Sequence, residues 1–453
     1  MQKPSIPKGT RDFSPSEMSG RNYIFDTIKE VFHSFGYLPI ETPAMENLAT
    51  LLGKYGEEGD KLLFKILNSG DFKNNLSERD LLESNSPALG SKISEKGLRY
   101  DLTVPFARYV VQHRNEITFP FKRYQIQPVW RADRPQKGRY REFFQCDVDV
   151  IGSNSLLNEH ELVKIIDNVF SRLGMDTVIR FNNRKILFGI IETLGEGGRM
   201  TEITTAIDKL EKIGYEGVLK ELSERGLQEH IVDRIKPILK FEGDNTGKLN
   251  YLDEFLKSSE TGQAGLIEIK QLVNYLEKDP VTADIEFDIT LARGLNYYTG
   301  AIFEVKSKKI DIGSICGGGR YDDLTGIFGL EDVSGVGVSF GADRIYDIML
   351  QLNLFPPGSE ASSKIMFVNF GETYLSPVFK YLNQLRSQNI SSELYPDAVK
   401  IKKQLSYANS KNIPYVGMVG EDEIKEGLIT LKDMKTGEQE SLNFAKLAER
   451  LTR

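Results

Sequence analysis

The chain has 453 residues, 40% of them hydrophobic and 27% charged, with a formal net charge of −7 at pH 7; at about 100–200 residues a domain this composition predicts a soluble globular protein of two or three domains. No apolar run approaches the ~18 residues of a membrane span, and the first residues lack the apolar core of a signal peptide. The two cysteines, Cys146 and Cys316, are too few for a disulfide scaffold, so we expect a cytoplasmic protein.

The N-terminal region predicts a helix followed by a strand. Ser14 to Glu17 form a capping box with proline at the first helical position, apolar residues then recur at helical spacing, and Gly36 ends the helix. Tyr37 to Thr42 reads as a strand that Pro43 terminates.

Residues 121–151 predict a long β-hairpin. The first arm, Phe121 to Arg131, alternates apolar and polar residues, and Pro128 within it indicates an edge or a bulge. In the second arm Phe143, Gln145, Asp147 and Asp149 share one face. Residues 121–141 hold seven basic side chains against one acid, which fits either a solvated loop or an anion contact, although the net charge alone argues against a nucleic-acid partner.

The middle of the chain predicts a mostly helical insertion at about 185–275 and then a return to strands. Ile285 to Leu291 alternates as a strand, a turn follows near Arg293 to Gly300, and Ala301 to Val305 reads as another strand. After the glycines 317–319, Val333 to Phe340 predicts a strand and Ala342 to Leu352 a helix.

The last quarter of the chain predicts a separate domain. Residues 353–363 have the composition of a linker. Beyond them strands at Lys364 to Phe370, near Glu393 and at Pro414 to Val419 alternate with helices. We therefore expect a small α/β domain over 364–453.

Several common catalytic motifs are absent from the sequence. There is no Walker A run, no dinucleotide fingerprint, and no H-E-x-x-H or C-x-x-C pair. The four histidines, His33, His113, His160 and His230, are not spaced as ligand pairs. A chain that handles phosphate without these motifs must use arginines, metal-binding carboxylates and backbone amides.

Five segments together resemble the histidyl-tRNA synthetase family, in order and over nearly the whole chain. They are Gly36–Pro43, Leu98–Pro105, Arg123–Phe143, Leu291–Gly300, and Gly318–Asp322 with Gly335–Ile345. The first, third and fifth look like class II motifs 1, 2 and 3, and the fourth resembles the family's signature peptide. Pro7–Phe13 also looks like the family's N-terminal segment. The sequence departs from the common pattern at Asn296, where Asp is usual, and at Asp343, where Glu is usual.

The resemblance implies an α+β fold: a class II antiparallel sheet flanked by helices over 1–350, with the helical insertion at about 185–275, a linker at 351–363 and an α/β anticodon-binding domain over 364–453. It also implies a homodimer that activates histidine with ATP and Mg²⁺ and passes it to tRNA(His). The lysines 400, 402 and 403 and the ring of Tyr395 would then contact RNA, although those lysines fit a solvated helix face equally well.

The resemblance also assigns arginines to ATP. Activation joins a carboxylate to the α-phosphorus, and fixed guanidinium groups suit the charge that grows there. Arg131 and Arg293 would be catalytic at the α-phosphate, Arg344 would hold the γ-phosphate, and Arg139 and Glu142 would be further ATP contacts. The protein ligands of Mg²⁺ are not assigned by the sequence.

Histidine would be recognised by a polar pocket. By resemblance its α-amino group would meet Asp101, Thr103 and Gln145, its carboxylate would meet Arg131, and Arg293 would be a further histidine-binding residue. Its imidazole would meet Asp149 and Tyr298, with Tyr297 adjacent. Such a pocket rejects analogues that lack the ring nitrogens by about 10⁴-fold, because its own polar groups would be left unpaired.

Two alternatives to this assignment remain. A non-catalytic relative keeps the catalytic fold as the regulatory subunit of ATP phosphoribosyltransferase, but it typically lacks the anticodon-binding domain and has degraded motifs. A class II synthetase for another amino acid would share motifs 1 to 3 without the signature peptide.

Overall fold

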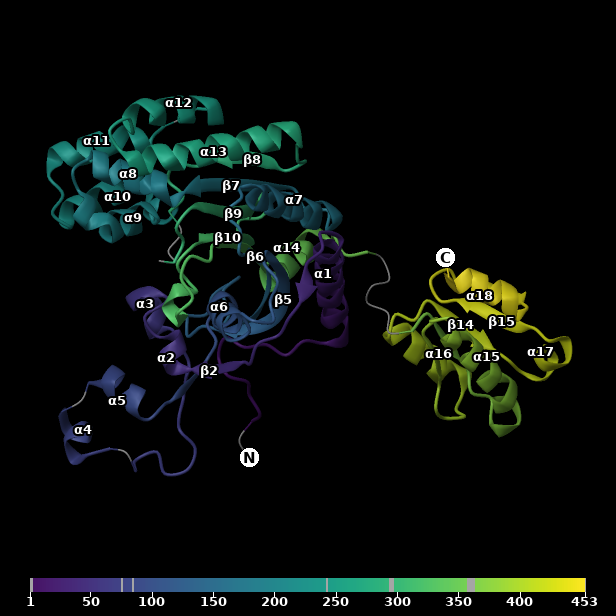
Figure 1. Cartoon of the computed structure of the whole chain (residues 1–453). Helices are drawn as coiled ribbons and strands as arrows, with labels where there is room; N and C mark the ends of the chain where they lie inside the picture. Colours follow the sequence, from purple (N-terminus) through teal and green to yellow (C-terminus); the bar gives the residue numbers. More distant parts are fainter. Residues whose placement is uncertain are drawn as a thin grey trace. The chain divides into compact units, whose positions relative to one another are not determined.

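The computed structural model describes residues 3–74, 76–83, 85–241, 243–292, 297–356 and 363–452. The chain divides into two compact units, one built from Met1–Arg11 and Ile24–Leu354 and the other from Asp12–Tyr23 and Phe355–Arg453. Each unit has its own sheet (Figure 1). Within the described ranges, no helix combines the length and the apolar character that crossing a bilayer requires.

The first unit is built on an eight-stranded sheet in the order β1-β5-β6-β11-β10-β9-β7-β8. Its two outer pairs, β1·β5 and β7·β8, are parallel, and the strands between them are antiparallel. The strands are β1 Leu38–Pro39, β5 Phe121–Trp130, β6 Glu142–Ile151, β7 Thr177–Asn183, β8 Asp284–Phe287, β9 Ala301–Ser307, β10 Cys316–Tyr321 and β11 Gly335–Gly341.

One face of this sheet is apolar and covered by helices. Phe340 of β11 contacts Phe32 of α1 (Pro15–Ser34) and Phe170 of α7 (Leu157–Arg172), and Phe144 of β6 contacts Phe25 of α1. The helix α14 (Ala342–Leu352) packs against β6 and β11 on the same side. The opposite face, called the polar face here, carries Gln145, Asp147 and Asp149 of β6.

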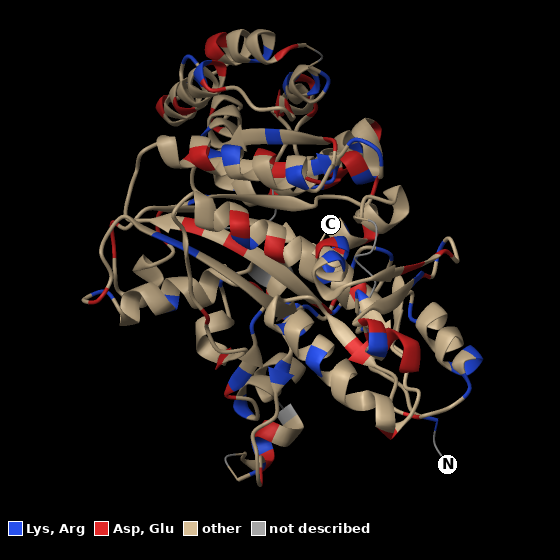
Figure 2. Cartoon of the chain, turned by 90° about the vertical axis from the view of Figure 1, so that its right-hand side faces the viewer, with Lys and Arg blue, Asp and Glu red and all other residues tan. Residues whose placement is uncertain are grey.

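Smaller elements complete the first unit. A three-stranded sheet, β2 Met45–Asn47, β4 Lys96–Leu98 and β3 Lys65–Ile66, lies with the short helices α2 Leu48–Leu51, α3 Gly56–Lys61, α4 Glu78–Glu83 and α5 Ser86–Lys92. The helix α6 (Thr103–Gln112) follows β4. The insertion consists of α8 Arg184–Thr193, α9 Met200–Ile207, α10 Leu210–Glu224, α11 Glu229–Leu239, α12 Asn245–Phe255 and α13 Glu260–Lys278. Basic and acidic residues are interspersed along these helices (Figure 2).

The second unit holds a five-stranded mixed sheet in the order β13-β12-β14-β15-β16. Ile365 and Phe367 pack with Leu382 and Leu447 on one side, and Met366 and Val368 pack on the other. Its elements are β12 Ile365–Phe367, α15 Leu375–Ser387, β13 Ser392–Leu394, α16 Ile401–Ser410, β14 Tyr415–Met418, α17 Glu421–Glu426, β15 Ile429–Asp433, β16 Gln439–Leu442 and α18 Phe444–Thr452.

Three sequence predictions need correction. The strand predicted from Tyr37 to Thr42 is only β1, and the strand predicted to Leu291 ends at Phe287. It ends there because the carboxylate of Asp288 accepts the Thr290 N–H and hydroxyl, which turns the chain. Tyr395 is buried against Tyr407, so its ring is not exposed for stacking on a base.

Candidate functional site

A cavity of about 480 Å³ lies on the polar face of the large sheet, a volume within the usual range for small-molecule sites. Larger but shallower hollows in the second unit gather none of the predicted site residues. The predicted residues that line the cavity are Asp101, Thr103, Arg131, Arg139, Gln145, Tyr297, Tyr298 and Arg344.

The register of the sheet explains why residues far apart in the chain share this cavity. Paired residues on neighbouring strands point to the same face, so Gln145 lies beside Gly341, Asp147 beside Ser339, and Asp149 beside Gly337. Gly337 is needed for space, since a Cβ there would lie 2.0 Å from Oδ1 of Asp149. The absence of side chains there makes room for the polar groups of β6.

Arg131 is held by its stem while its terminal nitrogens remain available. Its Nε donates to the carbonyl of Tyr100 at 3.1 Å, and its guanidinium lies 4.3 Å from the centre of the Tyr100 ring and 5.2 Å from that of Phe143. Among the described residues Nη1 and Nη2 of Arg131 donate no hydrogen bond. Those two groups therefore suit a phosphate or a carboxylate that enters the cavity.

Arg344 and the loop between β5 and β6 fix each other. Nε of Arg344 donates to the carbonyl of Gly138 at 2.7 Å, and Nη1 donates to the carbonyl of Ser314. Arg139 is half exposed and lies 3.7 Å from the carboxylate of Asp133. Arg344 and Arg139 thus add positive charge to the cavity lining.

The N-terminal segment supports this loop, a role that the resemblance alone did not specify. The N–H of Arg141 donates to the carbonyl of Gly9, and Arg11 forms an ion pair with Asp343 and stacks 3.6 Å from the centre of the Tyr140 ring. Asp343, the departure noted in motif 3, also accepts the N–H of Phe144 at 2.9 Å. It therefore connects the start of α14 to the loop and to the N-terminal segment.

Asp101 forms the acidic end of the cavity. It is buried, and its carboxylate accepts hydrogen bonds from Tyr55 Oη at 3.1 Å, Val104 N at 3.1 Å and Tyr297 Oη at 3.3 Å. Burial raises the pKa of Asp101, and these donors oppose the increase. Tyr55 was missed in the sequence because it belongs to none of the resembling segments.

Gln145 adds a neutral acceptor to the same wall. Its Nε2 donates to Ser339 Oγ at 2.7 Å, and within the described chain its Oε1 has no hydrogen-bond partner. An unpaired buried acceptor is costly until a donor binds it. Together with Asp101 it suits an ammonium group.

Asp149 lies on the predicted face but behind the residues that line the cavity. It forms an ion pair of 2.8 Å with Arg123, which is fully buried, and accepts a hydrogen bond of 2.7 Å from Tyr321 Oη. Burial raises the pKa of Asp149, and Arg123 opposes the increase. Arg123 and Tyr321 were not predicted as site residues, although the register pairs Arg123 with Asp149 directly.

Asp147 sits between Gln145 and Asp149 and is the less well compensated carboxylate. It is 2% exposed, and its Oδ1 has no hydrogen-bond partner among the described residues. Burial raises the pKa of Asp147 to about 7, with Arg123 opposing the increase and Asp149 adding to it.

The raised pKa of Asp147 predicts a specific pH dependence of stability. Between about pH 4 and 7 the folded chain keeps a proton on this carboxyl that the unfolded chain has released, so the free energy of unfolding falls as pH rises and levels off above pH 7. Asp147→Asn should make this decline shallower, as measured by denaturant unfolding at several pH values. Parallel curves for the two proteins would contradict the prediction.

Of the predicted site residues that the structure describes, Glu142 and Asp149 do not line the cavity. Glu142 is exposed and alternates onto the face opposite Phe143, which lines the cavity. Arg293, like Asn296, lies outside the described residues. Within the described ranges, no group of three or more His, Cys, Asp or Glu side chains is placed to hold a metal ion.

Comparison with known proteins gives a consistent result over the whole length. Residues 93–345 match the family model described as histidyl-tRNA synthetase, and residues 364–453 match an anticodon-binding domain. A protein of Porphyromonas gingivalis named histidine–tRNA ligase is 60% identical over 98% of this chain and 97% of its own. One of Phocaeicola vulgatus with the same name is 59% identical over 96% of both chains.

A solved structure shares the fold as well. The histidyl-tRNA synthetase from Nostoc sp. PCC 7120 covers 100% of both chains with a TM-score of 0.84 and 31% identity. Sequence relatives and a structural neighbour therefore point to the same family.

Proposed function

The chain belongs to the histidyl-tRNA synthetase family and ligates histidine to tRNA, and on that premise we propose that the cavity on the polar face binds histidine and ATP side by side. The observation that carries this proposal is that one cavity gathers the cations Arg131, Arg139 and Arg344 together with the acceptors Asp101 and Gln145. A carboxylate and a triphosphate need cations, and an ammonium needs acceptors.

Arg131 lies where the two substrates would react. In the proposal its terminal nitrogens bind the α-phosphate of ATP and the carboxylate of histidine, which brings two anions together and stabilises charge on the phosphate in the transition state. Arg344 and Arg139 bind the far end of the triphosphate. Arg293 contributes a further cation, on the strength of the signature peptide alone.

Histidine is oriented by hydrogen bonds at both of its ends. Asp101, Thr103 and Gln145 receive the α-ammonium group, for which Gln145 Oε1 is an unoccupied acceptor among the described atoms. Tyr297 and Tyr298 flank the imidazole, and Asp149, with its partners Arg123 and Tyr321, forms the polar base of that pocket.

Mg²⁺ enters with the triphosphate in this proposal. The described cavity offers no cluster of acids for a protein-only site, which fits an ion that keeps phosphate and water ligands and takes few from the protein. Asp133 is the lining carboxylate with the weakest partner, an ion pair of 3.7 Å with Arg139, so it is the residue that would add a protein ligand. The ion neutralises charge on the phosphates.

The second unit would bind tRNA(His), because residues 364–453 match an anticodon-binding domain. Lys400, Lys402 and Lys403 are exposed near the start of α16 and suit phosphate contacts. The same match over 364–453, with relatives named for the ligase over their full length, argues against the regulatory paralogue and against a synthetase for another amino acid.

The working form is proposed to be a cytoplasmic homodimer. Leu38 and Met45, in and beside the segment that resembles motif 1, are 58% and 55% exposed although they are apolar. Sedimentation equilibrium should therefore give twice the 51.2 kDa chain mass, and a single-chain mass at micromolar concentration would contradict it.

The test of the proposed function is exchange of labelled pyrophosphate into ATP with each of the twenty amino acids in turn. Histidine should be the only one that supports exchange, because the cavity's polar groups would be left unpaired by the others. Exchange without histidine, or with another amino acid in its place, would contradict the proposal.

A further inference from the structure

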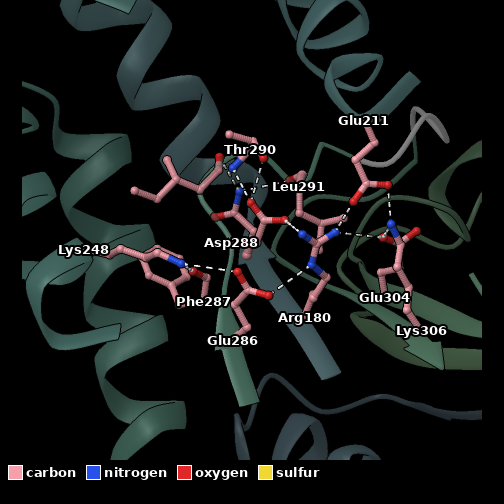
Figure 3. Close-up of polar contacts among 12 residues, drawn as sticks. Arg180, Glu211, Lys248, Glu286, Phe287, Asp288, Thr290, Leu291, Glu304 and Lys306 are labelled. Atoms are coloured by element: carbon pink, nitrogen blue, oxygen red, sulfur yellow. Dashed lines mark hydrogen bonds and ion pairs between the residues drawn. The ribbon is translucent and has the colours of Figure 1, made fainter. Parts of the chain in front are cut away.

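A cation on the large sheet connects the helical insertion with the segment that leads to the histidine pocket. Arg180 of β7 lies among carboxylates from different elements: Glu211 of α10, Glu286 of β8, Asp288 just after β8, and Glu304 of β9 (Figure 3). Its Nε is 3.2 Å from Glu286, and its Nη2 is 3.5 Å from Asp288.

Arg180 belongs to the same face of the sheet as the cavity. The register pairs it with Glu304, Glu304 with Gly317, Gly317 with Ser339, and Ser339 with Asp147. Arg180 and its carboxylate partners, called the Arg180 network here, therefore continue the polar face sideways, toward the edge of the sheet next to the insertion helices.

The first arm of the network, the ion pair between Arg180 and Asp288, holds the chain in place after β8. Oδ1 of Asp288 accepts the N–H of Thr290 at 2.9 Å and its hydroxyl at 2.7 Å, while Oδ2 faces Arg180. Asn182, two residues after Arg180, donates from Nδ2 to the carbonyls of Ile289 and Leu291, each at 3.0 Å. The strand β7 thus holds residues 288–291 in one conformation.

This segment touches the histidine pocket directly. Leu291 is buried in a small apolar cluster with Tyr298 and Ile302, and Tyr298 lines the cavity. A shift of residues 288–291 would therefore move the ring of Tyr298.

The second arm of the network reaches the insertion. Glu211, in the first turn of α10, bridges Arg180 and Lys306 of β9. The side chain of Glu211 is 59% exposed and that of Arg180 is 21% exposed. The Arg180–Glu211 pair should therefore contribute little to stability. Asp288 is more buried, with a side chain 11% exposed, so the fraction of active sites is titrated for each variant.

We propose that Arg180 is a positioning residue that couples the helical insertion to the histidine pocket, with Glu211 as the arm to the insertion and Asp288 as the arm to the pocket. This coupling rests on the function proposed above. Through Arg180 the insertion affects how tightly histidine binds, although the insertion does not contact the substrate.

The experiment compares kinetic constants of pyrophosphate exchange for Asp288→Asn, Glu211→Gln and the double variant of the full chain, with rates normalised to titrated active sites. Asn at 288 still accepts from Thr290 but loses the charge that Arg180 pairs with. We expect the KM for histidine to rise about 5- to 10-fold in Asp288→Asn and about 3-fold in Glu211→Gln, with the KM for ATP unchanged. The double variant should match Asp288→Asn, because each change breaks the same connection.

Asp284→Asn is the matched control, since Asp284 also lies on β8 and pairs with Lys308 at 2.6 Å but makes no contact with residues 288–291. Its KM values should equal those of the parent chain. The coupling would be overturned if the KM for histidine were unchanged in both single variants. It would also be overturned if the double variant raised that KM by the product of the two single effects. Either result would leave the proposed function intact. A loss of active sites with unchanged KM values would equally overturn the coupling. Failure of the parent chain to exchange would contradict the function itself, and the coupling with it.

Discussion

Arg131→Ala should lower the rate of histidine-dependent pyrophosphate exchange by about 10²- to 10³-fold, the usual cost of removing a preorganised donor from a developing oxyanion. The physical reason is that the stem of Arg131 is fixed by the Tyr100 carbonyl and by two aromatic rings. Its charged end is therefore in position before the substrates arrive, and no reorganisation is needed during the reaction.

Steady-state exchange kinetics measure this effect, and Arg134→Ala provides the control. Arg134 lies three residues away in the same basic loop but is exposed and does not line the cavity, so its loss should change the rate by less than about 2-fold. Equal rates for Arg131→Ala and the parent chain would remove Arg131 from the mechanism.

Arg123→Leu should have the largest effect on stability. Arg123 has no exposed surface and pairs with the buried carboxylate of Asp149, so its removal leaves an uncompensated charge inside the protein. Breaking a buried pair in this way costs about 3–5 kcal/mol of the free energy of unfolding, which denaturant unfolding at pH 8 would measure.

The same ion pair predicts how that loss of stability changes with pH. Without Arg123 the pKa of Asp149, already raised by burial, rises further, so the carboxyl takes up a proton as pH falls and the deficit shrinks. The double variant Arg123→Leu with Asp149→Asn should recover most of the lost stability. A loss below about 1 kcal/mol in the single variant at pH 8 would show that the pair is not compensating a charge.

The sequence predicted those parts of the fold that local patterns determine. The capping box at Ser14 does form, with Glu17 Oε2 accepting the Ser14 N–H at 2.7 Å, and the helix Ala342–Leu352 has the predicted bounds. Pro128 lies beyond the part of β5 that pairs with β1, which is Arg123 and Tyr124, and its carbonyl instead accepts from Nε of Arg99 at 2.8 Å.

The sequence could not predict features that depend on pairing between distant strands. The close approach of Gly337 to Asp149 is one such feature, since a Cβ on Gly337 would lie 2.0 Å from Oδ1 of Asp149. Alternation past Phe287 continued the strand pattern, but a side chain–backbone hydrogen bond from Thr290 ended it. Hydrophobic periodicity along a short stretch of sequence indicates neither a close approach between distant strands nor a side chain–backbone hydrogen bond that ends a strand.

The residues of the candidate site also fall into two groups, those that the sequence predicted and those that it did not. Residues in the resembling segments, such as Asp101 and Arg344, were found from the sequence and line one cavity. Tyr55, Arg123 and Tyr321 were missed, because each acts on a site carboxylate through a contact that only the folded chain creates. Asp149 was found, but its burial behind the lining residues was not foreseen.

The most direct test of the whole account is a crystal structure of the chain with histidine and a non-hydrolysable ATP analogue. The account predicts the α-phosphate and the histidine carboxylate within hydrogen-bond distance of Arg131, the γ-phosphate at Arg344, and the α-ammonium group at Asp101 and Gln145. A triphosphate bound away from Arg131 and Arg344, or an imidazole remote from Tyr298, would contradict it.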